Sequence, residues 1–265
     1  MTSFQRLWLF RDYISSAIVT DLRYRYTRSA LGGAWAILQP LAQAAIFALV
    51  MSVILQARLP GMTGTSSYGA YLLSGLVGWH LFVDGVNQGL SLFLRHANNI
   101  KKVRFPLLSL PIIAAGIISL NHLLLLVATL FIISLLGFAP LAAKVWIMLP
   151  VLWLLTMALG LGLGLVLGII NVFMRDLEIM VPIVLQLQFW FSAIVYSPSV
   201  LPELYQRLLL INPMAGLVQS YQAILVFDQW PHWIWLAYPA VLASFCFVLA
   251  AWLIKRSFTQ MVDIL

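Results

Sequence analysis

The sequence predicts an all-α membrane protein with six transmembrane helices. Two observations carry this prediction: the composition and the length of the apolar runs. Of the 265 residues 63% are hydrophobic and only 9% are charged, and the mean hydropathy is +0.99. A soluble domain is about half apolar and about a quarter charged. The composition therefore places the chain among membrane proteins.

Six apolar runs are candidates for transmembrane helices. A helix needs about 20 apolar residues to cross the hydrocarbon core of a bilayer. The runs are residues 35–56, 68–93, 107–136, 145–172, 179–196 and 233–254. We expect a single transmembrane domain over residues 1–265, in which a six-span core (34–256) lies between a cytoplasmic interfacial segment (1–33) and a cytoplasmic tail (257–265).

The basic residues predict the orientation of these spans. Only Arg58, Lys144 and Arg207 lie on one side, whereas the other twelve of the 15 Lys and Arg residues lie on the opposite side. Such a bias marks the cytoplasmic side. Both termini are therefore expected in the cytoplasm. The net charge of +7 is explained by this orientation, without nucleic-acid binding.

The N-terminal residues 4–22 predict an amphipathic interfacial helix. Phe4, Trp8, Ile14 and Ile18 fall near one face of a helix drawn through this segment. Such a helix can lie in the plane of the headgroups. A plain solvated helix is the alternative.

The segment 197–231 between the fifth and sixth spans predicts two short re-entrant helices on the periplasmic side. It is too apolar for a solvated loop, and prolines interrupt it. Pro202 is expected to open one short helix and Pro213 to end one. A seventh span is the alternative, which the even number of spans and the prolines disfavour.

Several kinds of chemistry are missing from the sequence. It has no Gly-rich loop followed by Lys-Ser or Lys-Thr, so we expect no nucleotide cofactor on this chain. Its single cysteine, Cys246, cannot form an internal disulfide or a cysteine metal cluster. Asn121 and His122, near the middle of the third span, favour an interhelical hydrogen bond over a proton relay.

Local motifs in this sequence resemble the permeases of type-2 ABC exporters, and the polysaccharide-export branch in particular. These motifs are the run from Arg23 to Trp35, the run Asn171-Val172-Phe173-Met174-Arg175-Asp176-Leu177, the triplet Asn212-Pro213-Met214, and Arg104-Phe105-Pro106 after a basic loop. One departure is Ala193, where many relatives carry proline. This departure leaves open where the fifth span breaks.

The resemblance implies a transport subunit with no enzymatic activity of its own. Its expected partners are a second copy of itself and two copies of a separate ATPase, which would hold ATP and Mg²⁺. Its expected substrate is a polysaccharide linked to polyprenyl pyrophosphate, with O-antigen as the main candidate. The substrate would be exported across the bacterial inner membrane. Capsule or teichoic acid export and small-molecule or lipid export remain alternatives within the family. A stand-alone channel or secondary transporter is the alternative from another class.

Four groups of candidate site residues follow from the resemblance and the spacing. The loop after the second span is expected to dock on the ATPase. Three arginines before the first span are candidates for binding the lipid pyrophosphate, with attraction to ordinary anionic lipid as the alternative. Aromatic residues at the outer ends of spans two and five are candidates for a polysaccharide channel, with an interfacial aromatic belt as the alternative. The candidates are, for docking, His96, Asn98, Asn99, Lys101, Lys102 and Arg104; for pyrophosphate, Arg23, Arg25 and Arg28; for the channel, Trp79, Phe82, Phe189, Trp190, Phe191 and Tyr196; and for a periplasmic gate, Pro198, Pro202, Tyr205, Pro213 and Tyr221.

Overall fold

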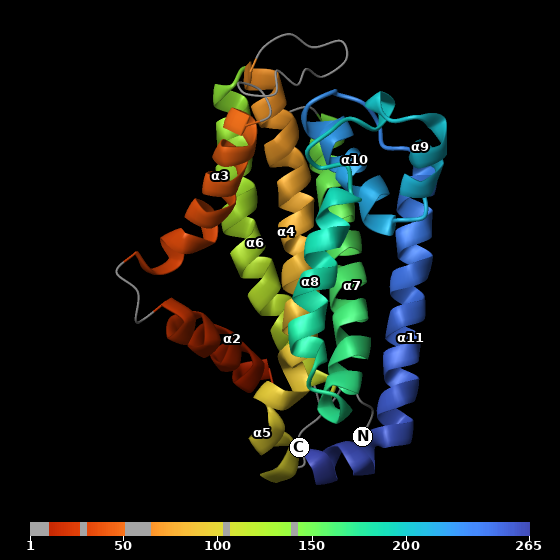
Figure 1. Cartoon of the computed structure of the whole chain (residues 1–265). Helices are drawn as coiled ribbons and strands as arrows, with labels where there is room; N and C mark the ends of the chain where they lie inside the picture. The colour runs from red at the N-terminus through yellow and green to blue at the C-terminus, as the bar shows by residue number, and fades with distance from the viewer. Residues whose placement is uncertain (1–10, 27–30, 51–64, 103–106, 139–142) are drawn as a thin grey trace.

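A computed structural model describes residues 11–26, 31–50, 65–102, 107–138 and 143–265 of the chain (Figure 1). All regular structure in these ranges is helical, which confirms the all-α prediction. The helices are α2 (Arg11–Tyr26), η1 (Gly32–Ala34), α3 (Trp35–Ala48), α4 (Thr65–Arg95), α5 (Ala97–Lys102), α6 (Ser109–Leu135), α7 (Ala143–Phe173), α8 (Leu177–Trp190), η3 (Pro198–Val200), α9 (Glu203–Leu209), α10 (Pro213–Leu225) and α11 (Trp233–Ile264).

Helix α4 is the centre of the bundle. It packs most extensively against α7, and also against α6, α10 and α3, while α11 packs on the other side of α7 (Figure 1). The side chains of Tyr71, Leu72 and Phe82 on α4 are almost completely buried. Because its neighbours cover α4, this helix tolerates polar residues such as Ser74 and Gln88 that would be costly against lipid.

Glycines allow α4 and α7 to approach closely. A Cβ atom added at Gly89 would lie 2.5 Å from the carbonyl carbon of Gly164, and one added at Gly85 would lie 2.9 Å from that of Gly160. Small residues one helical turn apart permit this backbone contact between membrane helices. Gly162 instead faces α11, where its added Cβ would meet the Cβ of Cys246 at 3.2 Å. The glycines of α7 thus serve packing against two neighbours.

Three of the described helices are long and apolar enough to cross a bilayer: α6, α7 and α11. Their bounds lie within three residues of the predicted spans, except that α11 continues ten residues beyond residue 254. Helix α4 has 31 residues but is more polar, and α3 and α8 have 14 described residues each. The predicted first span continues into residues 51–56, which lie outside the described ranges.

The predicted fifth span, residues 179–196, ends early. Helix α8 stops at Trp190, and Ala193 adopts a left-handed backbone with φ of 53°. This conformation is uncommon for a residue other than glycine and ends the helix. Residues 191–196 then continue without helical structure, so the helix ends six residues before the predicted end of the span, and this is the break that the sequence left open.

Helices α9 and α10 form a sharply bent pair between α8 and α11, with an angle of 97° between them. Pro202 is the N-cap of α9, as predicted. Pro213 does not end a helix but opens α10, because its missing N–H is not needed at the first helical position. The side chain of Asn212 caps α10 by accepting a hydrogen bond from the Met214 N–H at 3.0 Å. The geometry matches two short helices that fold back.

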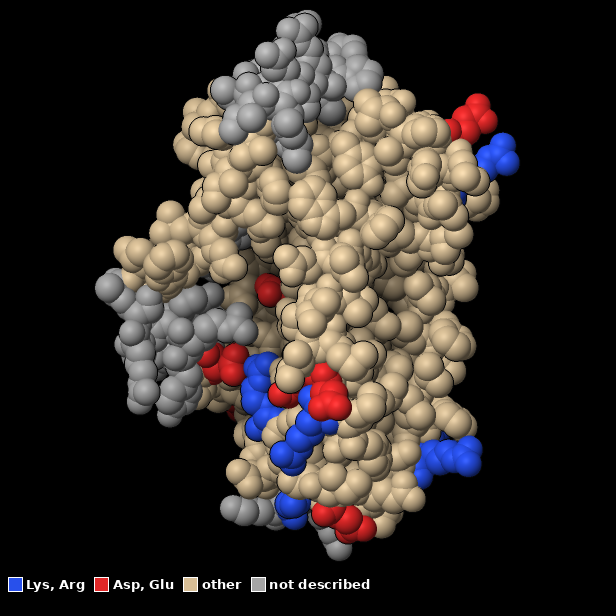
Figure 2. Space-filling model, viewed as in Figure 1, with Lys and Arg blue, Asp and Glu red and all other residues tan. Residues whose placement is uncertain are grey.

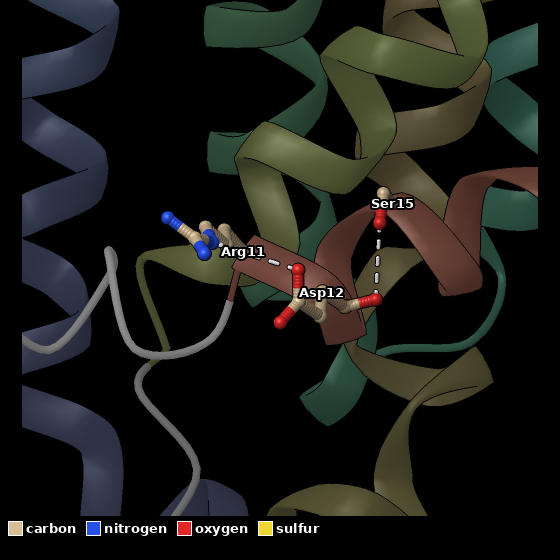
Figure 3. Close-up of polar contacts among 3 residues, drawn as sticks. All are labelled: Arg11, Asp12 and Ser15. Carbon is tan, nitrogen blue, oxygen red and sulfur yellow. Dashed lines mark hydrogen bonds and ion pairs between the residues drawn. The ribbon is translucent and has the colours of Figure 1, made fainter.

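Helix α2 extends obliquely to one side from the lower half of the bundle and packs on α6 (Figure 1). Ile14 and Ile18 are partly buried on its inner face, and Ile18 reaches the backbone of α6 at Gly116. At its start, Arg11 pairs with Asp12 at 3.5 Å and the Ser15 hydroxyl donates to the Asp12 carbonyl at 3.0 Å (Figure 3). This ion pair is exposed and stabilises the helix little. The predicted residues 4–10 of the interfacial helix lie outside the described ranges.

Charge on the surface is segregated along the bundle. Figure 2 shows blue and red side chains gathered around the α5 end and a small charged group near α9. Between them lies a broad band over the helices that is uncharged except for red atoms inside its hollow. The apolar side chains of α6, α7 and α11 point outward in that band, for example Val127, Ile147 and Val248, each more than half exposed. This pattern fits a bundle whose middle faces hydrocarbon.

Candidate functional site

Four aromatic rings from three helices meet between α3, α4 and α8. Phe47 of α3 stacks on Phe189 of α8 with ring centroids 5.5 Å apart, and it meets Trp190 edge-on at 6.0 Å. Trp79 of α4 meets Phe189 at 5.7 Å in a T-shaped arrangement. These distances and angles are those that aromatic pairs prefer. We call this set (Phe47, Trp79, Phe189 and Trp190) the aromatic layer.

The aromatic layer borders a pocket of about 290 Å³ between the three helices. Figure 2 shows that the surface is hollowed between α3 and α8. Three amide side chains, Gln43, Asn87 and Gln186, share the pocket with the four rings. The remaining lining residues are Val83, Pro182 and Leu185. The pocket therefore combines flat apolar faces with neutral hydrogen-bonding groups.

A second, more open groove continues from this pocket along α3. It has a volume of about 810 Å³ and shares Gln43 and Phe47 with the pocket. Its other lining residues include Trp35 and Gln39. Residues 35, 39, 43 and 47 follow one another at a spacing of four, so they form one stripe along α3 in which two amides lie between two aromatic rings.

The predicted channel aromatics are only partly brought together. Phe189 and Trp190 lie at the end of α8 as predicted, but Trp79 and Phe82 lie near the middle of α4, not at its outer end. The predicted span, residues 68–93, already has both positions near its middle, and α4, with 31 residues, keeps them far from either terminus. Phe82 packs beside Trp79 with centroids 5.8 Å apart and is 1% exposed, so it supports the layer from behind.

Phe191 and Tyr196 follow α8 and do not line the pocket. Phe191 is exposed, whereas the Tyr196 hydroxyl donates a hydrogen bond of 2.8 Å to the carbonyl of Trp190. Sequence reasoning also missed Phe47 and the three amides. Their spacing held a signal, because Gln43 and Gln186 each stand one helical turn before an aromatic residue of the layer.

Hydrogen bonds from α4 satisfy the unwound segment after α8. The Tyr71 hydroxyl donates to the carbonyls of Tyr196 at 2.9 Å and Ala193 at 3.2 Å, and the Tyr68 hydroxyl donates to that of Val195 at 2.6 Å. A non-helical backbone is tolerated at membrane depth only where such partners replace water. Tyr68 and Tyr71 thus fix the point at which α8 breaks.

The candidate gate residues separate into two groups. Tyr205 on α9 is 55% exposed, and Pro198 and Pro202 open η3 and α9 nearby in the chain. Tyr221 on α10 is completely buried against α4, where a Cβ added at Gly78 would lie 2.6 Å from its ring. The structure therefore contradicts a place for Tyr221 on the same surface as Tyr205, because α10 packs its tyrosine face into the bundle.

The candidate docking loop forms the short helix α5 at the charged end of the bundle (Figure 1). Asn98 and Lys101 are exposed, whereas the Asn99 amide donates to the Tyr13 hydroxyl of α2 at 3.3 Å. Burial and the neighbouring Arg95 lower the pKa of His96, and Asp21 of α2 acts in the opposite direction. The side chain of Lys102 and the whole of Arg104 lie outside the described part of the chain.

The candidate pyrophosphate residues cannot be placed in the same detail. Arg23 and Arg25 belong to the last turns of α2, but their side chains are outside the described set, as is Arg28 altogether. Helix α2 ends shortly before α3 begins at Trp35. The described backbone of Arg23 and Arg25 thus lies on the segment leading to the helix that lines the pocket.

His122 does not make the expected interhelical hydrogen bond. It is 3% exposed, and neither ring nitrogen has a hydrogen-bond partner among the described residues. Its ring adjoins an apolar groove of about 270 Å³ between α6 and α7. No group of three side chains suited to a metal ion occurs in the described ranges.

Comparison with known proteins decides the family. The sequence profile described as "ABC-2 type transporter" matches residues 15–226. The chain belongs to the ABC-2 type transporter family. The matched range runs from α2 to the end of α10 and contains the pocket, the α8 break and the α9–α10 pair, while α11 lies beyond it.

Named relatives in this family are transport permeases. The O-antigen export system permease protein RfbA of Myxococcus xanthus is 29% identical over 224 residues, covering 83% of this chain and 82% of that protein. One from Klebsiella pneumoniae is 26% identical over 202 residues, covering 76% and 75%. The polysialic acid transport protein KpsM of Escherichia coli is 23% identical over 218 residues, covering 80% and 81%.

Membership of the ABC-2 family explains the absence of catalytic groups. The chain is a multi-pass membrane permease, a transport subunit without a catalytic domain, and permeases of this family pair with an ABC ATPase. It is related to O-antigen and polysialic acid exporters. The predicted assignment to type-2 ABC exporter permeases is therefore confirmed.

Proposed function

We propose that this chain is the transmembrane subunit of an ATP-driven exporter that moves a polysaccharide linked to polyprenyl pyrophosphate, most of all O-antigen, across the inner membrane. The observation that carries the proposal is the aromatic layer on α3, α4 and α8. The flat face of a sugar ring presents C–H groups, which pack on aromatic faces. Such contacts are similar for successive sugars, so a chain can slide past them.

The proposed topology has six spans. The described parts of α3 and α8 have 14 residues each, and each is proposed to belong to one span. With six spans, both termini lie on the side of α5, where Figure 2 shows the charged side chains. The positive-inside bias makes this the cytoplasmic side.

The proposed assembly is a homodimer with two copies of a separate ATPase, which holds ATP and Mg²⁺. Helix α5 is the proposed docking element, because it is the helix that projects at the cytoplasmic end and exposes Asn98 and Lys101. His96 and Asn99 attach it to the bundle and to α2. Lys102 and Arg104 extend the same basic segment.

The substrate pyrophosphate is proposed to meet Arg23, Arg25 and Arg28. Arginine binds phosphate oxygens through a fixed fork of donors. Arg23 and Arg25 belong to the last turns of α2, and Arg28 follows them in the sequence before α3. A lipid held there would have its sugar chain beside the groove that begins at Trp35 and leads to the pocket. Phe191, Tyr196 and the exposed Tyr205 would follow on the periplasmic side, where α9, with Pro198, Pro202 and Pro213, forms the proposed gate.

The proposal is tested by replacing one ring of the aromatic layer. Trp190 is 45% exposed, so Trp190→Leu should leave folding intact but reduce surface polysaccharide about five- to tenfold, as expected if one aromatic contact of about 1 kcal/mol is lost. The matched control is Trp146→Leu on α7, which is 60% exposed and outside the pocket. Equal export by both variants, at equal protein levels, would refute a polysaccharide path through the pocket.

Capsule export is the second candidate function. The observation in its favour is the similarity to the polysialic acid transport protein KpsM, which covers 80% of the chain, against 76% and 83% for the two RfbA proteins. The two candidates share the pathway but differ in the chemistry of the polymer. Polysialic acid carries a carboxylate on every sugar. A path for polysialic acid must accommodate these charges, whereas a path for uncharged sugars need not.

A further inference from the structure

The amides of the pocket form a second layer beneath the aromatic layer. Gln43 on α3 and Gln186 on α8 each lie one turn, about 6 Å, before a ring of the layer. Helix α4 runs antiparallel to α8. Trp79, in the middle of α4, meets Phe189 near the end of α8. The Leu90 carbonyl, later in α4, accepts a hydrogen bond from the Asn171 amide, which precedes α8 in the chain. Asn87, two turns beyond Trp79, is therefore displaced toward the same end of the bundle as the two glutamines.

The three amides are available to a ligand. Asn87 and Gln186 are exposed and Gln43 is half-buried, and none of their side-chain amides is hydrogen-bonded to another described residue. A carboxamide offers an N–H donor and a carbonyl acceptor. A sugar hydroxyl likewise donates and accepts. Three such groups below a layer of rings match a sugar that stacks through one face and hydrogen-bonds through its hydroxyls.

The charge of the pocket is equally informative. None of its lining residues among those described is Lys, Arg or His. The nearest cation on α4 is Arg95, two turns beyond Asn87, and its guanidinium donates to Gln88 Oε1 at 3.0 Å and to the Ser91 hydroxyl. An acidic sugar would lose water here without gaining a cationic partner among the described lining residues.

We propose that this pocket selects uncharged sugars, and that Gln43, Asn87 and Gln186 determine this specificity. The inference rests on the proposed function and narrows it to polymers whose units in the pocket carry no carboxylate or phosphate. It predicts that the exported polymer differs in charge from polysialic acid. The amides position each sugar, and the rings let the chain advance.

The test measures binding of two soluble oligosaccharides to the full-length chain in nanodiscs with its ATPase, by titration calorimetry. The probes are maltoheptaose and oligosialic acid of equal length. We expect maltoheptaose to bind at least about tenfold more tightly. Gln43→Leu and Gln186→Leu should each weaken its binding about two- to tenfold, the range for one net hydrogen bond. Gln219→Leu is the control, because that amide donates to the Ala215 carbonyl within α10.

A charge variant completes the test. Gln186→Lys supplies the cation that the described pocket lacks and should strengthen oligosialic acid binding while weakening that of maltoheptaose. Equal affinity of the wild-type protein for both probes would overturn the specificity and leave the proposed function standing. Binding of neither probe would overturn both. Unchanged maltoheptaose affinity in both glutamine variants would show that these amides do not bind the sugar.

Discussion

Phe47 and Phe189 stack with their rings 5.5 Å apart and 20° from parallel, although 141 residues separate them in the chain. This contact joins α3 to α8, and the edge-on contact of Phe47 with Trp190 at 6.0 Å joins the same two helices. Both helices present a ring one turn above an amide, so the contact also aligns the two layers of the pocket. The pairing makes α3 and α8 one wall of the proposed path.

Close packing of α4 on α7 should be sensitive to a single methyl group. Gly89→Ala places a Cβ 2.5 Å from the backbone of Gly164, so one helix must move. We expect a loss of about 1–3 kcal/mol, seen as a lower melting temperature in detergent. Gly69→Ala, in the same helix with its nearest contact at 3.9 Å, is the control and should be neutral or slightly stabilising. Equal melting temperatures for the two variants would contradict the close packing.

The break of α8 should depend on Tyr71. Tyr71→Phe removes the hydroxyl that donates to the carbonyls of Ala193 and Tyr196, so the Tyr196 carbonyl loses this donor while the Ala193 carbonyl keeps only the longer hydrogen bond from the Gln222 amide at 3.5 Å. The expected cost is about 1–3 kcal/mol, with increased proteolysis or hydrogen exchange at residues 191–196. Tyr205→Phe, on the exposed face of α9, serves as the comparison. Protection of residues 191–196 that does not change in Tyr71→Phe would show that these hydrogen bonds do not fix the break.

Helix α5 should transmit ATP hydrolysis to transport. The double variant Lys101→Glu and Lys102→Glu should insert normally but export about tenfold less polymer per ATP hydrolysed, because charge reversal disrupts docking on the ATPase. Lys255→Glu with Arg256→Glu makes the same charge change on α11 and should have a smaller effect. The ratio of export to hydrolysis in proteoliposomes is the measurement. An unchanged ratio in the α5 variant would remove α5 from coupling.

The environment of His96 predicts a pH effect on stability. Burial and Arg95 hold its pKa below the usual value of about 6.5, so the folded protein binds its proton less readily than the unfolded chain. Stability from this residue is present above about pH 6.5 and is lost as the pH falls toward the lowered pKa. Melting curves at about pH 7.5 and pH 5.5 should show a larger decrease for the wild type than for His96→Gln. Parallel decreases would contradict the lowered pKa.

The helices were predictable to the extent that they are apolar runs. Helices α6 and α7 match their predicted spans within three residues at each end because their length and hydropathy are local properties. The end of α8 was not predictable, since Tyr68 and Tyr71, more than 100 positions earlier in the chain, supply the hydrogen bonds that replace the helix. The reversed role of Pro213 was readable in principle, because Asn212 before it is a strong N-cap residue.

The sequence predicted that aromatic residues would line the site, but it did not predict which residues come together in the pocket. Aromatic residues on two of its helices were singled out, but Phe47 was not, because an aromatic residue inside an apolar span gives no sign of the neighbour it meets. The amides Gln43, Asn87 and Gln186 were also passed over, although uncharged polar residues within spans carry a cost that favours a role. The burial of Tyr221, a candidate gate residue, was not predictable, because the direction of α10 against α4 depends on tertiary packing at Gly78.

The most direct test of the central claim is photo-cross-linking of the moving polymer. p-Benzoylphenylalanine would replace Phe189 in the aromatic layer or, as the control, Phe245, which is 59% exposed on α11 and outside the pocket. Irradiation during active export should join polysaccharide to the chain at position 189, seen as a ladder of heavier bands that bind polysaccharide antibody, and should give none at position 245. A ladder at position 245, or none at 189 while export continues, would contradict a path between α3, α4 and α8.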